Sequence, residues 1–70
     1  MQYYVIKDKK SGKYFRGKGV NRWGKYLNQA SIYRAKGQVE FSLHELKLNY
    51  REEDIDPVIV TIQIIENEVE

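Results

Sequence analysis

The residues best suited to chemistry lie in one basic and aromatic stretch, KYFRGKGVNRWGKY, at positions 13–26. Lys and Arg neutralise phosphate groups, and exposed aromatic rings stack on unpaired bases. A small sheet can also enter the DNA major groove with such side chains on the base edges. The candidate contacts, with two later cations added, are Tyr14, Arg16, Lys18, Arg22, Trp23, Lys25, Arg34 and Lys36. In the alternative interpretation the cations are only exposed charges on the outer strand positions of a sheet and keep it soluble.

Trp23, between Arg22 and Gly24, has two interpretations of its own. An exposed Trp among cations is typical of an interface anchor, whereas a buried Trp would cover the core. Of Tyr14 and Phe15, one must face inward, because neighbouring strand residues point to opposite faces.

The formal net charge of +2 conceals a division between the two halves of the chain. Residues 1–36 hold ten Lys or Arg against one Asp, whereas residues 37–70 hold two against nine acids. Such asymmetry indicates contact with nucleic acid or membrane. The alternative is that the halves fold together and mix their charges on one surface.

Other chemical motifs are incomplete. His44 is the only histidine, and its neighbours Ser42 and Glu45 would point to different sides of a helix. The carboxylates of residues 52–56, EEDID, lack the spacing and the glycine of a calcium loop. SGK and GKG do not complete a phosphate-binding loop. The sequence therefore predicts no enzyme, no cofactor and no metal site.

Size and composition predict one small domain, residues 1–70. The chain has no Cys, so neither disulfides nor Cys-based zinc sites can support its core. Its apolar runs are too short to span a membrane, and its first residues do not form a signal peptide. We therefore expect a cytoplasmic protein.

Four segments have strand character. Residues 2–7 and 13–19 predict a hairpin around residues 8–12, with Gly12 free to adopt a positive φ. Residues 30–35 predict a short third strand after an irregular connection, and residues 58–65 predict the last strand.

Residues 37–48 change to a helical period. Val39, Leu43, Leu46 and Tyr50 share one helical face, and Asn49 could end the helix in the left-handed conformation. A strand with Val39, Phe41 and Leu43 alternating is the alternative. The predicted class is α+β: a small, mainly antiparallel β-sheet with one helix on one face, in the order β-β-β-α-β.

One helix of about 12 residues is roughly 18 Å long and covers one face of such a sheet. Each strand carries adjacent apolar residues, such as Tyr3 with Tyr4 and Val58 with Ile59, so both faces should be partly apolar. An uncovered apolar face marks a partner or self-association surface. Alternatively, residues 20–29 fold back and cover it with Trp23 and Leu27.

The ordered pattern YYVIKDKKSGKY, then W…LNQASIYRAKGQ, then a helix, resembles small accessory proteins of phages and prophages of Gram-positive bacteria. These share a Y-x-I-K-D-x-x-x-G-K-Y opening and a later A-x-I-Y-x-x-K. The resemblance covers residues 3–40 and implies a protein that acts by binding. The chain also resembles the arm-binding domains of tyrosine recombinases, but differs by its strand 58–65 and lacks a recombinase core.

The sequence therefore predicts a non-enzymatic, phage-encoded protein that binds a host protein or nucleoprotein complex, such as a defence nuclease, and inhibits or redirects it. In a variant, Glu52, Glu53, Asp54 and Asp56 imitate nucleic-acid phosphate. The first alternative is a direct DNA- or RNA-binding module that uses the basic residues. The second is a structural homodimer joined through the apolar face or the edge of strand 58–65.

Overall fold

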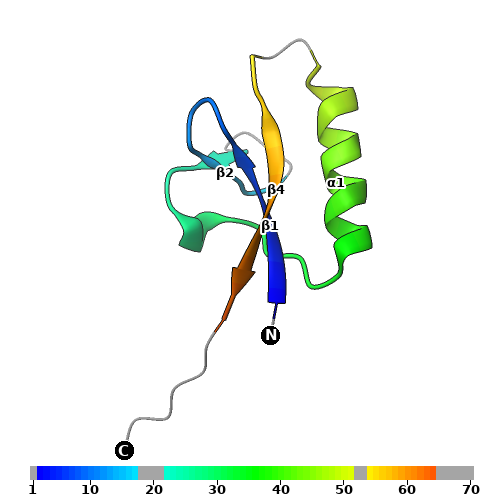
Figure 1. Cartoon of the computed structure of the whole chain (residues 1–70). Coiled ribbons are helices and arrows are strands. Elements are labelled where there is room, and N and C mark those ends of the chain that lie inside the picture. Colours follow the sequence, from blue (N-terminus) through cyan, green and yellow to red (C-terminus); the bar gives the residue numbers. More distant parts are fainter. Residues whose placement is uncertain (1, 18–21, 52–53, 65–70) are drawn as a thin grey trace, which may run out of the picture.

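A computed structural model describes residues 2–17, 22–51 and 54–64 as an antiparallel sheet with one helix beside it (Figure 1). The strands are β1 (Gln2–Asp8), β2 (Tyr14–Phe15), β3 (Trp23–Gly24) and β4 (Pro57–Gln63). A 3-10 turn, η1 (Leu27–Gln29), and the helix α1 (Lys36–Asn49) lie between β3 and β4 in the sequence. The predicted α+β class and the strand-strand-strand-helix-strand order are confirmed.

β1 is an inner strand of the sheet, whose order is β3-β2-β1-β4. It pairs with β4 along its whole length, from Gln2 opposite Gln63 to Asp8 opposite Pro57. On its other side, β1 pairs with β2 at Lys7 and Tyr14, and the amide and carbonyl groups of Tyr4 bond those of Tyr33. β1 therefore has hydrogen-bonding neighbours on both sides.

The predicted third strand at residues 30–35 is wrong. Tyr33 forms only an isolated bridge there, and the third strand lies instead at Trp23–Gly24, inside the predicted irregular connection. It forms because the chain reverses after β2 and pairs Phe15 with Trp23 and Tyr14 with Gly24. The predicted strand 13–19 is shorter, Tyr14–Phe15, and residues 18 and 19 lie outside the described residues.

The helix follows its predicted spacing. Val39 and Leu46 are buried, and Leu43 and Tyr50 pack against the same cluster. The left-handed end predicted for Asn49 is wrong, because Asn49 is the last helical residue and no described residue other than glycine has a positive φ. Gly12 has the predicted positive φ, at 76°, in the turn between β1 and β2. The helix of the described part of the chain is too short and polar to cross a membrane.

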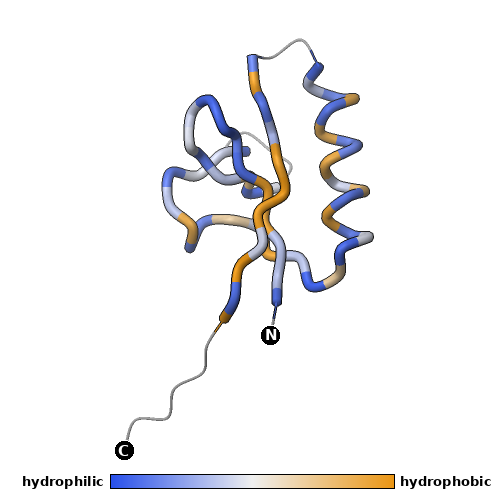
Figure 2. Tube along the Cα trace, in the orientation of Figure 1, coloured by the Kyte–Doolittle hydropathy of each residue, from blue (hydrophilic) through white to orange (hydrophobic). Residues whose placement is uncertain are grey.

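The core lies between α1 and one face of the sheet. Ile6, Phe15, Val39 and Leu46 form a buried cluster, against which Tyr4, Trp23 and Ile59 also pack. Figure 2 shows hydrophobic residues gathered where β1 and β4 lie side by side, and alternating with hydrophilic ones along α1. The face of the sheet that carries Ile6 and Phe15 is called the helix face below, and the other is called the helix-free face.

Candidate binding surfaces

The helix-free face follows from the strand register. Antiparallel partners share a face, and alternate residues change face. Because Ile6 and Ile59 lie in the helix-side cluster, their neighbours Val5 and Val60 lie on the opposite side. The residues of the helix-free face are Tyr3, Val5, Lys7, Tyr14, Val58, Val60 and Ile62. Only one of these seven side chains is charged, as the sequence predicted for this face.

This face is neither fully open nor fully covered. Val5 is 0% exposed, whereas Val58, Val60 and Ile62 are half-buried. At its β3 end, the turn after β3 covers it, since a Cβ on Gly24 would lie 2.7 Å from the Cβ of Gln29. The predicted cover by Leu27 does not form, because Leu27 is 42% exposed. The β4 side therefore presents a half-buried apolar strip.

Two cations lie on the same face as that strip: Lys7 on β1, opposite Val58 of the strip, and Arg16 on the far side of β1 and β2, beside β3. The Lys7 ammonium lies 5.3 Å from the centre of the Tyr14 ring, on the same face. Arg16, two residues after Tyr14, is exposed, and its Cδ lies 2.9 Å from the position of a Cβ on Gly24. Since Gly24 pairs with Tyr14, Arg16 also extends over the helix-free face. Of the predicted site residues, the structure thus brings Tyr14 and Arg16 together, with Lys7 added.

Trp23 and Arg22 lie on the other side of the sheet. The Trp23 ring packs edge-on against Phe15, with centroids 5.7 Å apart, and is half-buried. The Arg22 guanidinium lies 3.9 Å from the centre of the Tyr50 ring, at the end of α1. Both residues therefore join the β2–β3 unit to the helix-side core, where they contribute to packing.

The remaining predicted cations do not gather around Arg16. Lys25 is exposed beside Tyr26, with its ammonium 5.6 Å from that ring's centre. Arg34 and Lys36 are exposed where α1 begins. The Lys36 Nζ atom lies 4.0 Å from Glu40 Oε1. Lys18, like Glu52 and Glu53, lies outside the described residues. Asp54 and Asp56 are exposed.

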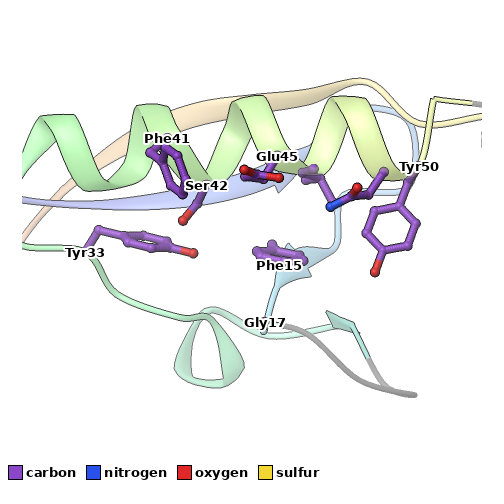
Figure 3. A pocket seen from close by; sticks show the side chains of 9 residues that line it. Phe15, Gly17, Tyr33, Phe41, Ser42, Glu45 and Tyr50 are labelled. Carbon is purple, nitrogen blue, oxygen red and sulfur yellow. The ribbon is translucent and has the colours of Figure 1, made fainter.

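A cleft of about 570 Å³ separates α1 from β2 and the segment around Tyr33 (Figure 3). Its walls are aromatic: Tyr33 faces Phe41 on the helix, Phe15 lies across from Glu45, and Tyr50 lies at one end. Glu45 is the only charged side chain among the described residues that line it. Its volume is that of a small-ligand site. Sequence reasoning missed this cleft, because β2 and α1, which line it, are far apart in the sequence.

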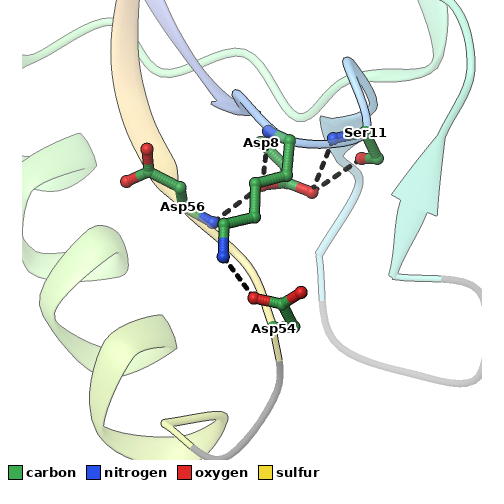
Figure 4. Close-up of polar contacts among 5 residues, drawn as sticks. Asp8, Ser11, Asp54 and Asp56 are labelled. Atoms are coloured by element: carbon green, nitrogen blue, oxygen red, sulfur yellow. Dashed lines mark hydrogen bonds and ion pairs between the residues drawn. The ribbon is translucent and has the colours of Figure 1, made fainter.

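Sequence reasoning also missed Asp8. Asp8 as a whole residue is 3% exposed. Its carboxylate accepts hydrogen bonds from the Lys10 and Ser11 amides, the Ser11 hydroxyl and the Asp56 amide, at 2.7–3.2 Å (Figure 4). Burial acts to raise the pKa of Asp8, but these hydrogen bonds outweigh it and lower the pKa below its ordinary value. An Asp at the start of the short loop D-K-K-S-G is a turn signal that could have identified it. Asp8 ties the β1–β2 turn to the start of β4.

Neither the cleft nor the hydrogen bonds around Asp8 bring described residues into the arrangement of a catalytic centre. Within the cleft, Ser42 and Glu45 share no hydrogen bond, and His44 is exposed on α1. No group of three His, Cys, Asp or Glu side chains in the described parts of the chain could hold a metal ion. Comparison with protein-family models, curated proteins and solved structures finds no match to this chain. The surfaces themselves therefore carry the functional argument.

Proposed function

We propose that this protein is a non-enzymatic binding domain that holds a protein or nucleoprotein partner on its helix-free sheet face. The single observation that carries this proposal is the combination of Lys7 and Arg16 with the apolar strip of β4 on that face. An apolar centre with a charged rim is the usual anatomy of a protein interface. The partner surface would be apolar at its centre and acidic beside it.

The resemblance to accessory phage proteins supports a more specific proposal, in which the partner is a host macromolecular complex that the protein inhibits or redirects in the bacterial cytoplasm. In this proposal Tyr14 and Arg16 are direct contacts. Trp23 acts indirectly, because its ring packs on Phe15 and fixes the position of β3 beside β2.

The test compares two variants in affinity capture from a bacterial lysate treated with nuclease. The double variant Lys7→Gln, Arg16→Gln removes the charge at the rim of the helix-free face and should lose a partner that the unchanged protein retains. The control, Lys47→Gln, removes one positive charge from the exposed surface of α1. This variant should still capture the partner. Equal capture by all three proteins, with unchanged melting temperatures, would contradict the proposal.

Direct nucleic-acid binding is a second candidate, favoured by the Lys7–Tyr14 contact on an accessible sheet face. Cations that neutralise phosphates make affinity fall steeply with salt, and an adjacent ring can stack on a base. A gel-shift titration with labelled single-stranded DNA and RNA should show binding at low salt that weakens at moderate salt. Absence of a shift at low salt would exclude this candidate without affecting capture of a protein.

A further inference from the structure

The outer side of β4 is an edge without the usual protection. Among residues 2–17, 22–51 and 54–64, β4 pairs only with β1 and is the last strand of the sheet. Its seven residues, PVIVTIQ, contain no charge, and the single proline stands at the first position. Exposed edge strands are normally protected by lysines, prolines or bulges, because a free edge pairs with another chain. This edge is therefore suited to pairing.

The hydrogen bonds show which backbone groups of β4 face outward. Tyr4 exchanges both its backbone bonds with Tyr33, so the even-numbered residues of β1 direct their amides and carbonyls away from β4. The odd-numbered residues Tyr3, Val5 and Lys7 therefore bond to their partners Ile62, Val60 and Val58. By alternation, the backbone groups that face outward are those of Ile59, Thr61 and Gln63, with the carbonyl of Pro57.

We propose that a second copy of this chain occupies this edge, with the two β4 strands antiparallel about a two-fold axis at Val60. In this register Ile59 and Thr61 of one copy lie opposite Thr61 and Ile59 of the other, and each such pair exchanges two hydrogen bonds. Val60 lies opposite Val60, and Val58 opposite Ile62. A symmetric interface of this kind closes as a dimer.

The strand is complementary to itself in this register. All seven residues of β4 are paired, and every opposed pair on the helix-free face is apolar. No like charges oppose each other, because the strand has none. Pro57 lies opposite Gln63 at each end, where its missing amide costs only a terminal bond. A shift of the axis to Ile59 or Thr61 would leave part of the strand unpaired.

Such a dimer joins two sheets into one and doubles the width of the half-buried strip of Val58, Val60 and Ile62, because the two copies of the strip lie side by side. It does not depend on the proposed function, since it uses the strand edge and the proposed partner uses the face. The two can therefore fail separately.

The first test is sedimentation velocity over a concentration series from low to high micromolar. The unchanged protein should shift from monomer to dimer. Thr61→Pro removes an outward amide while leaving every β1–β4 bond, so it should remain monomeric with an unchanged melting temperature at low concentration. Thr61→Ser keeps the amide and should still dimerise. A monomer at all concentrations, or a dimer that survives Thr61→Pro, would overturn the proposal.

The second test fixes the register, using single cysteines in a chain that has none. Two Val60→Cys residues would face each other across the axis, at the Cβ separation of a non-hydrogen-bonded pair, and should form a disulfide-linked dimer on mild oxidation. Val58 lies on the same face and is also half-buried. In the dimer, however, the two Val58 positions would be far apart, so Val58→Cys should not form a disulfide with itself. A mixture of Val58→Cys and Ile62→Cys should form the mixed disulfide. If Val58→Cys and Val60→Cys, each tested by itself, formed disulfide-linked dimers to the same extent, the register would be contradicted.

Discussion

β1 and β4 are paired residue by residue, yet the more apolar strand is the less buried. β1, QYYVIKD, includes Lys7 and Asp8, but Val5, Ile6 and Asp8 are buried. β4, PVIVTIQ, carries no charge, but Pro57 alone is buried. The two strands share one helix above them and one register. Composition therefore does not explain the difference.

The position of each strand in the sheet explains the difference in burial. β1 has β2 and Tyr33 on one side and β4 on the other, whereas β4 has β1 alone among the described segments. An inner strand is shielded by neighbours on both sides, so it can include a buried carboxylate if its hydrogen bonds are satisfied. An edge strand keeps part of its apolar surface exposed even when it packs under a helix. The excess apolar character of β4 is thus surface available to a partner.

The test with the largest expected effect on stability uses Ile6 and Ile59, which lie opposite each other on the helix face. Ile6 is 0% exposed, so Ile6→Ala should lower the free energy of unfolding by about 2–5 kcal/mol, through lost burial and a residual cavity. Ile59 is half-buried, so Ile59→Ala should cost clearly less. Urea denaturation at one low protein concentration measures both.

If Ile6→Ala does not fold, Ile6→Val and Ile59→Val give the same comparison on a smaller scale, about 0.5–1.5 kcal/mol at the buried site. Equal losses at the two positions would mean that β4 is as well shielded as β1, and the argument for an exposed edge would fail.

Asp8 provides a second test, with a smaller expected effect, two residues further along β1, where it pairs with Pro57. Asp8→Asn replaces an acceptor that faces the Ser11 amide with a donor, and should cost about 1.5–3 kcal/mol, the range for hydrogen bonds to a charged group. Because hydrogen bonds lower the pKa of Asp8 in the folded state, its carboxylate stabilises the fold above the unfolded pKa of 3.8. That stability is lost as the pH falls through the lowered folded pKa.

Urea midpoints measured between pH 7 and pH 2 would show this. The unchanged protein should lose stability below about pH 4, and Asp8→Asn should lose less over the same range, because it has no proton to take up there. Parallel pH profiles for the two proteins would show that the turn does not depend on the ionised carboxylate.

The elements that the sequence predicted well depend on local patterns. The apolar spacing of Val39, Leu43 and Leu46 identifies the helix because it follows from α-helical geometry alone. Gly12 marks the first turn for a similarly local reason. The last strand was predicted at 58–65 and is observed at Pro57–Gln63, which is within one or two residues wherever it is described.

What the sequence could not predict depends on how distant segments meet. Residues 30–35 have the composition of a strand, but only Tyr33 lies where β1 has free backbone groups, and β2 occupies the rest of that side. Trp favours strands but Gly does not, so Trp23 and Gly24 show no clear local strand pattern. They pair because the chain turns back after Phe15. The same applies to the candidate site: Tyr14 and Arg16 share a face through local alternation, whereas Lys7 joins them through pairing across the hairpin.

The smallest expected effect concerns the exposed ion pair between Lys10, in the β1–β2 turn, and Asp54, before β4. The hydrogen bond and charge of Asp54 raise the pKa of Lys10, so any stability from this pair is present below the ordinary pKa of 10.5 and lost as the pH rises above it. Both side chains are largely exposed, and water and salt screen such pairs. Asp54→Asn should therefore leave the urea midpoint at pH 7 and moderate salt unchanged within error, in contrast to Asp8→Asn nearby. A loss comparable to that of Asp8→Asn would show that the charges of the turn, rather than its buried acceptor, attach the inner strand to the edge strand.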